Sequence, residues 1–270
     1  MLESLALPTP EELESKHNEV IRFLNEQDKA GILLFRRQYI ENLIGVLMAT
    51  EIPLDKFVLF EFGAGSTDDI DQLDCQPSVR HFFKLNPIIE YHGYDPDFKK
   101  DINIKRLELL IEENPLTFDE FVIKRKNNFL RDNKRAIQKS REIYSTEILN
   151  RLLEISKSSI TCSNNYSSIT SLVTDTIKKE KIPVIYSSHV LTDPYKSEEI
   201  QYLSLPGLHM HQATLYEMQG MLNITRGDND SKLYKNRFRS AFNLQDKELS
   251  TYFFTKKYWP GDMAHWWINK

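Results

Sequence analysis

Phe57–Thr67 reads Phe-Val-Leu-Phe-Glu-Phe-Gly-Ala-Gly-Ser-Thr, an apolar run that ends in Glu61 and a Gly-x-Gly turn. The apolar run predicts a strand that is covered on both faces of a parallel sheet. Gly63 and Gly65, with Ala64 between them, favour a tight turn and leave the backbone open to a ligand, because glycine has no side chain. The stretch therefore predicts a buried strand whose carboxyl end meets a nucleotide-type ligand.

Two further segments have the same form. Pro87–Asp97 predicts a second strand, and the carboxylate of its Asp95 could bind the two hydroxyls of a ribose. Ile182–Asp193 predicts another buried strand, which changes at its end to small polar residues and a histidine, namely Ser187, Ser188 and His189. Since ligands of open α/β sheets bind outside the carboxyl ends of the strands, we expect these strand ends to form one site.

With these motifs the chain resembles the class I (Rossmann-like) S-adenosylmethionine-dependent methyltransferases over about residues 57–205. In that family the first strand ends in an acid and a Gly-x-Gly turn, the second in an acid for the ribose, and the fourth often in a Ser-x-His-Val-Leu-like run. The resemblance implies a doubly wound, mostly parallel α/β sheet, S-adenosylmethionine as cofactor and methyl transfer as the reaction. It implies cofactor contacts from Glu61, Gly63, Ala64, Gly65, Asp95, Ser163, Asn164, Ser187 and Ser188, and a catalytic His189.

The first loop departs from the pattern of dinucleotide-binding proteins. Thr67 stands where a third glycine is common, and Gly65 lies 30 residues before Asp95, more than the roughly 20 residues typical of those units. Four acids crowd the loop: Asp68, Asp69, Asp71 and Asp74. They would repel a pyrophosphate and tolerate a sulfonium cation, which favours S-adenosylmethionine over NAD or ATP; a solvated loop explains them equally well.

Patterns along the chain predict its organisation. Thr9 as N-cap, Pro10 and Glu12 predict a helix that runs to about Gln27, and apolar spacing predicts a second helix over Ile32–Ala49. Residues 1–52 would form a helical cover, and residues 53–270 a methyltransferase-like domain. About 98–157 carry no strand signal, which indicates a helical insertion in that domain.

A weak third strand is predicted over Ser158–Ser163, followed by an amphipathic helical segment, Ile169–Lys181. Ser163 and Asn164 stand where the resembling family contacts adenine with a polar side chain. Asn164 is equally well interpreted as the N-cap of the helix.

The insertion contains a basic run, Lys124–Arg141, with a single acid, Asp132. If the run is helical, its cations form a stripe that could bind a nucleic acid or another acidic partner. A solvated charged helix explains the run without any partner, and its single aromatic residue, Phe129, offers little surface for base stacking.

Candidate acceptor-side residues come from several segments. His189 could deprotonate an acceptor at neutral pH, or it could only hold a positional hydrogen bond. His209 and His211 would share one face of a strand and could meet the substrate, as could Tyr39 in the helical cover. We predict no metal, because no cluster of carboxylates with tight spacing accompanies the two histidines.

The chain's three tryptophans lie in the last 12 residues: Trp259, Trp266 and Trp267. They predict either a closing strand packed on the sheet edge or a wall of an acceptor pocket. The sequence Trp-Pro-Gly-Asp at 259–262 predicts a turn.

Composition bounds the remaining possibilities. The 270 residues are 40% hydrophobic and 27% charged with a net charge of −4, which excludes a general polyanion binder. Cys75 and Cys162, the only cysteines, indicate free thiols, and without a secretory or membrane-spanning segment we expect a cytoplasmic protein. We expect methyl transfer to a small-molecule, natural-product-like acceptor. The alternatives are an RNA or protein methyltransferase that uses 124–141 and a non-catalytic binding protein of this fold.

Overall fold

The computed structural model describes residues 2–27, 33–64, 79–96, 108, 150, 153–154, 162–188, 197–224, 230–256 and 259–270. Its helical elements are η1 (Leu2–Ser4), α1 (Pro10–Gln27), α2 (Leu33–Ala49), η2 (Leu54–Lys56), α4 (Val79–Leu85), α9 (Tyr166–Lys178), η4 (Ser197–Ser204), α10 (Leu215–Leu222) and α11 (Ser231–Ala241). Its strands are β1 (Phe57–Phe62), β2 (Glu90–Tyr94), β3 (Cys162–Ser163), β4 (Ile182–Ser188), β5 (Gly207–Thr214), β6 (Leu249–Lys256) and β7 (Trp259–Asn269).

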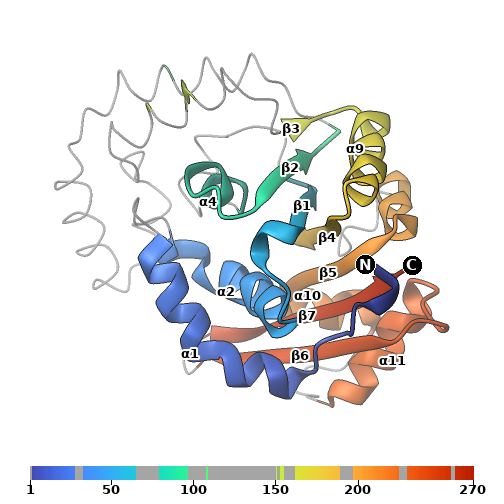
Figure 1. Ribbon diagram of the computed structural model, residues 1–270. Coiled ribbons are helices and arrows are strands. Elements are labelled where there is room, and N and C mark those ends of the chain that lie inside the picture. The colour runs from blue at the N-terminus through green and yellow to red at the C-terminus, as the bar shows by residue number, and fades with distance from the viewer. Residues whose placement is uncertain are drawn as a thin grey trace.

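The strands form one mixed sheet in the order β3-β2-β1-β4-β5-β7-β6 (Figure 1). Six of them are at least five residues long, and β3 adds a two-residue edge. The pairs from β3 to β5 are parallel, whereas β7 runs antiparallel to both β5 and β6. The prediction of a mostly parallel α/β sheet is confirmed. The order is not β3-β2-β1-β4-β5-β6 of the dinucleotide-binding fold, because β7 separates β5 from β6.

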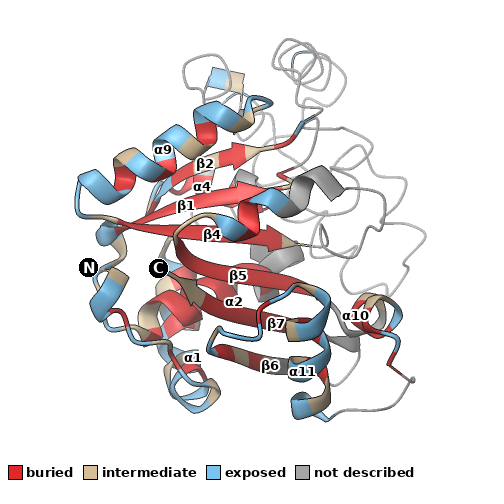
Figure 2. Cartoon of the chain, turned by 90° about the vertical axis from the view of Figure 1, so that its right-hand side faces the viewer, coloured by how far each residue is buried: buried red, intermediate tan, exposed pale blue. Residues whose placement is uncertain are grey.

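Helices cover both faces of the sheet, which gives a three-layer α/β/α sandwich (Figures 1 and 2). One core cluster joins α1, α2 and α4 to one face, and a second joins α9, η4, α10 and α11 to the other. We call these the α2 face and the α11 face. The outer sides of α9 and α11 are exposed to solvent (Figure 2).

The central strand β1 shows why the sheet has two cores. It pairs with β2 on one side and β4 on the other, and all six of its residues are buried. Because side chains alternate along a strand, Phe57 and Leu59 enter the cluster of the α2 face, and Phe60 enters that of the α11 face. The continuous apolar run is therefore the pattern of a strand that is covered twice.

The N-terminal helices begin and pack as the sequence indicates. Thr9 Oγ1 accepts a hydrogen bond from the Glu12 amide at 3.2 Å, and Glu12 Oε2 accepts one from the Thr9 amide at 2.7 Å. This capping box begins α1, which ends at Gln27 as predicted. A Cβ at Gly45 of α2 would lie 2.5 Å from Leu13 Cδ1 of α1, so the glycine allows the two helices to approach closely.

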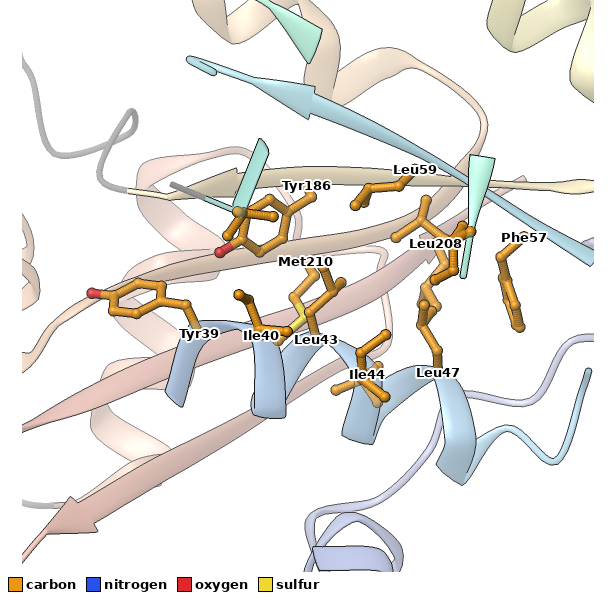
Figure 3. Close-up of a cluster of buried hydrophobic side chains, with 14 of the residues drawn as sticks. Tyr39, Ile40, Leu43, Ile44, Leu47, Phe57, Leu59, Tyr186, Leu208 and Met210 are labelled. Carbon is orange, nitrogen blue, oxygen red and sulfur yellow. The ribbon is translucent and has the colours of Figure 1, made fainter. Parts of the chain in front are cut away.

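Helix α2 lies along the sheet with its apolar side chains on the strands. Figure 3 shows Leu47 pointing toward Leu208 and Leu43 lying beside Met210, and all four belong to the core cluster of the α2 face. The second predicted helix is thus confirmed as a covering element of the parallel strands.

The C-terminal hairpin β6–β7 completes the sheet. Trp266 and Trp267 are buried on the α2 face and the α11 face respectively, so their side chains belong to the core. Trp266 Nε1 donates to Pro8 O at 2.8 Å, which ties the N-terminal segment to β7. The predicted turn at 259–262 is wrong: these residues begin β7, and Asp262 pairs with Phe254 of β6.

Several predictions fall outside the described residues. They include the acidic loop with Asp68, Asp69, Asp71 and Asp74, the helical insertion, apart from residues 108, 150 and 153–154, and the basic run within it. None of the helices that the structure describes is both long and apolar enough to span a membrane.

Candidate functional site

The turn after β1 is closed by the backbone of β2. Gly63 has a φ of 74°, a region that glycine enters at little cost. Its amide and that of Ala64 both donate to Tyr94 O, at 2.9 and 3.0 Å. The chain therefore leaves β1 in a tight turn beside the last residue of β2, and Gly65, the next predicted site residue, lies outside the described residues.

Asp95 continues directly from this junction. Its amide donates to Ser163 O of β3 at 3.1 Å, and its side chain is buried with 6% exposed. The predicted ribose acid thus lies between the turn after β1 and the end of β3.

The end of β3 leads straight into α9. The Asn165 amide donates to Ser163 Oγ at 3.0 Å, and Asn165 Oδ1 accepts from the Ser168 amide at 3.2 Å. Asn165 is therefore the N-cap of α9, and the interpretation of Asn164 as the cap is wrong by one residue. The Asn164 side chain is exposed at this edge.

The strand register brings the predicted residues to one edge of the sheet. Phe62 pairs with Tyr94 on one side and Ser187 on the other, and Tyr94 pairs with Ser163. The next residues along these strands lie together at this edge, and they are Gly63, Asp95, Asn164 and Ser188, of which Ser188 still pairs with Gln212 of β5.

Glu61 lies just inside this edge on the α2 face. It is buried with 2% exposed, and the Tyr91 hydroxyl donates to its Oε2 at 2.5 Å. The aromatic donor on β2 keeps the carboxyl group of β1 in a defined position. Tyr91 was missed in the sequence, although it precedes Asp95 in the same predicted strand.

Aromatic rings flank the edge on the α11 face. Phe62 stacks on Tyr202 with ring centroids 4.7 Å apart, and Tyr94 meets Tyr166 edge to face at 5.6 Å. Tyr94 and Tyr166 are half-buried, and burial raises the pKa of the Tyr166 hydroxyl, with Tyr94 adding to the effect. A planar, uncharged group would find aromatic surface here.

The two serines of β4 face opposite sides of the sheet. Ser187 is buried on the α11 face, where its Oγ contacts Tyr202 and His211. Ser188 is half-buried and ends the strand. Only Ser188 is placed at the open edge, and His189, the predicted catalytic residue, lies outside the described residues.

The structure separates the two histidines of β5. They share one strand face as predicted, but His209 pairs with Ile185, two residues before the level of Ser187, and stacks on Trp267 at 4.9 Å. Its Nε2 lies 2.7 Å from Leu205 O, and burial lowers its pKa to about 4. His211 lies at the level of Ser187 with no exposed surface.

Tyr39 is held near the same edge by β5. Gln212 Nε2 donates to Tyr39 O at 3.0 Å, and Gln212 Oε1 accepts from Asn42 Nδ2 at 3.0 Å. Tyr39 and Tyr186 lie at one end of the core cluster with their hydroxyl oxygens directed the same way, while Phe57 marks the opposite end (Figure 3). Gln212 and Asn42 were missed, because a single amide carries no periodic signal.

The assembled edge combines Glu61 and Asp95 with hydroxyl groups and aromatic faces. Two carboxyl groups beside a glycine turn suit a ligand that carries hydroxyls and a positive charge better than one that carries a pyrophosphate. The residues that the structure describes contain no group of three or more His, Cys, Asp or Glu side chains arranged to hold a metal ion. Comparisons of the chain with family models, curated proteins and solved structures give no match.

Proposed function

We propose that the protein is an S-adenosylmethionine-dependent methyltransferase that acts on a small-molecule acceptor. One observation carries the proposal: the turn at Gly63 and Ala64 is hydrogen-bonded to Tyr94 O, which places the carboxyl end of β1 beside the acid Asp95. A turn and an acid on neighbouring parallel strands are the pair that an adenosine ligand requires.

The remaining groups at the edge fit the parts of such a cofactor. Asp95 would accept hydrogen bonds from the ribose hydroxyls, and Ser163 and Asn164 would contact the adenine. Glu61, held by Tyr91 two residues before the Gly63 turn, would direct its carboxyl group toward the positively charged part of the ligand. The half-buried rings of Tyr94 and Tyr166 add an apolar wall.

The strand order is compatible with the proposal. The antiparallel β7 between β5 and β6 distinguishes the sheet from the dinucleotide-binding fold. The turn and the acid lie on neighbouring parallel strands, as the proposal requires. This support concerns the fold alone, since one fold hosts many functions.

Methyl transfer from S-adenosylmethionine requires few catalytic groups from the protein. S-adenosylmethionine supplies an activated methyl group on a sulfonium, so the protein has to align the acceptor and exclude water. Helix α2, fixed through Gln212, would cover the acceptor with Tyr39 at the edge. His189, which directly follows Ser188, is the proposed base where the acceptor must lose a proton.

Calorimetric titration tests the proposal with four ligands: S-adenosylmethionine, S-adenosylhomocysteine, NAD and ATP. We expect micromolar binding of the first two and none of the others. Asp95→Asn should weaken binding at least about tenfold, since a hydrogen bond to a charged group contributes roughly 1.5–3 kcal/mol. Asp175→Asn is the matched control, because Asp175 lies on α9 and pairs with Lys178 away from the site.

The titration also separates the alternatives. No binding of either S-adenosyl compound by the folded protein would refute the proposal. Binding without turnover on any acceptor would indicate a non-catalytic protein of this fold. Salt-sensitive binding to RNA would shift the acceptor class to nucleic acid.

A further inference from the structure

Three buried side chains from three elements form a hydrogen-bonded chain beneath the end of β4. The Tyr202 hydroxyl of η4 donates to Ser187 Oγ at 2.9 Å, and Ser187 Oγ lies 2.9 Å from His211 Nδ1 of β5. None of the three residues is more than 1% exposed. A buried polar side chain that lacks its hydrogen-bond partner destabilises the protein. The three side chains are therefore expected to keep one defined geometry.

The directions of the hydrogen bonds define the state of the histidine. A serine hydroxyl has one proton to donate. Ser187 accepts from Tyr202 and keeps its own proton to donate, so we expect that proton to point to His211 Nδ1 and the imidazole proton to be on Nε2. The ring of Phe238 of α11 stacks on this imidazole, with centroids 5.9 Å apart and ring planes inclined by 25°.

The chain holds the strand at the level where the candidate site begins. Ser187 pairs with Phe62 of β1 and His211 of β5, and the next residue, Ser188, ends β4. Tyr202 also stacks on Phe62 at 4.7 Å, so η4 is attached to both β1 and β4 at this level. Ser188, the last residue of β4, therefore follows a residue that contacts β1, β5 and η4.

We propose that Tyr202, Ser187 and His211 are positioning residues of the candidate site, which fix the carboxyl end of β4 and so orient Ser188 toward the ligand. The inference rests on the proposed function for its ligand and adds a role that the sequence motifs do not show. It reassigns Ser187, whose hydroxyl acts inside the core rather than on the cofactor.

Four variants and a control test the chain through S-adenosylhomocysteine binding. Ser187→Ala, Tyr202→Phe and His211→Leu each break it. In His211→Asn the side-chain oxygen lies two covalent bonds from Cβ, as Nδ1 does in histidine, so the variant keeps an acceptor for Ser187. Thr251→Val is the matched control, because Thr251 is buried, bonds to His265 Nδ1 at 2.8 Å and stands outside the chain.

We expect the three breaking variants to weaken binding about tenfold, and His211→Asn and Thr251→Val to remain within about twofold of the parent protein, all measured well below each variant's melting temperature. Equal affinity in the breaking variants would overturn the proposal. The proposal would also be overturned if the loss of affinity followed only the loss in melting temperature, so that Thr251→Val or His211→Asn bound as weakly as His211→Leu.

A ligand-free measurement separates this inference from the proposed function. In amide hydrogen exchange, Ser187→Ala and His211→Leu should speed exchange at Ser187 and Ser188 while β2 exchanges as before, and His211→Asn should restore slow exchange. Nitrogen-15 spectra of the parent should show His211 protonated at Nε2. If the parent protein binds no S-adenosyl compound, the proposed function fails, and unchanged exchange at the end of β4 would independently refute the positioning role.

Discussion

The Tyr91 hydroxyl donates a hydrogen bond to Glu61 Oε2 at 2.5 Å, so a side chain of β2 determines where the acid of the first motif lies. Both residues are buried on the α2 face, with 6% and 2% exposed. The acid at the end of β1 is thus held by its neighbouring strand before any ligand arrives. The position of Glu61 thus depends on Tyr91, which is part of neither the Gly-x-Gly motif nor the predicted ribose site.

Removing this donor should destabilise the protein. Tyr91→Phe leaves the buried Glu61 oxygen without its phenol partner, and we expect a loss of about 1–3 kcal/mol in the free energy of unfolding. Urea denaturation measures the loss. Tyr252→Phe, at a half-buried tyrosine that interacts with Glu14, should cost less than about 1 kcal/mol; equal losses in the two variants would contradict the assignment.

Replacing Gly207 or Gly220 by alanine should change the stability of the protein in opposite directions. Gly207 has a φ of 152°, and a Cβ there would lie 2.6 Å from Pro183 O. We expect Gly207→Ala to cost at least about 1–3 kcal/mol from the backbone conformation alone. Gly220 of α10 has no atom within 4 Å of an added Cβ, so Gly220→Ala should stabilise by about 0.5–1 kcal/mol. Thermal melting of both variants decides the matter, and a stabilising Gly207→Ala would be incompatible with the structure.

Acid should unfold the protein partly through His209. Burial lowers the pKa of His209 to about 4, although its hydrogen bond to Leu205 O acts in the opposite direction. Because the unfolded imidazole titrates near 6.5, the unfolded state binds more protons below that pH. The contribution of His209 to the free energy of unfolding is therefore fully present above about pH 6.5. It falls as the pH is lowered from about 6.5 to 4, by roughly 3 kcal/mol at the lower limit.

Urea midpoints across this pH range measure the effect. His209→Phe keeps a ring against Trp267 and should flatten the acid limb, even if it lowers stability at neutral pH. In this variant stability should still fall somewhat with decreasing pH, because burial also lowers the pKa of His265, and His211 adds to this effect. An unchanged slope in His209→Phe would show that other groups cause the acid response.

The amide contact between α2 and β5 should be energetically coupled. Gln212→Met preserves volume but leaves Asn42 Nδ2 and Tyr39 O without their partner, which we expect to cost about 1–3 kcal/mol. Asn42→Leu should cost less in the Gln212→Met background than in the parent, with a coupling of about 0.5–3 kcal/mol in a double-mutant cycle. Strict additivity would show that the two amides do not interact in solution.

Local patterns were sufficient for the elements whose signals are local. The capping box of Thr9 and Glu12 places the start of α1, and the apolar run before Glu61 places β1, because hydrogen bonds to the next turn and burial on both faces leave their marks within a few residues. The helix cap was misplaced from Asn165 to Asn164, since two adjacent asparagines offer the same chemistry and only backbone geometry distinguishes them.

Long-range pairing lay beyond those patterns. Nothing in residues 259–262 shows that they pair with β6, and Trp-Pro-Gly-Asp has the composition of a turn. The insertion of β7 between β5 and β6 depends on contacts between segments more than 40 residues apart, such as His211 with His265. The separate roles of Ser187 and Ser188 follow from which face of the sheet each one meets.

The sequence by itself determined the strand that ends in Glu61 and Gly63, the acid Asp95 on a second strand, and the two N-terminal helices, because each is written as a short pattern of burial, turn and capping residues. Only the tertiary structure decided that Tyr91 holds Glu61, that Gln212 anchors α2, and that Tyr202, Ser187 and His211 share one buried chain. Those contacts join residues whose separation along the chain leaves no periodic trace, and packing of the sheet between its two helical layers brings them within hydrogen-bonding distance.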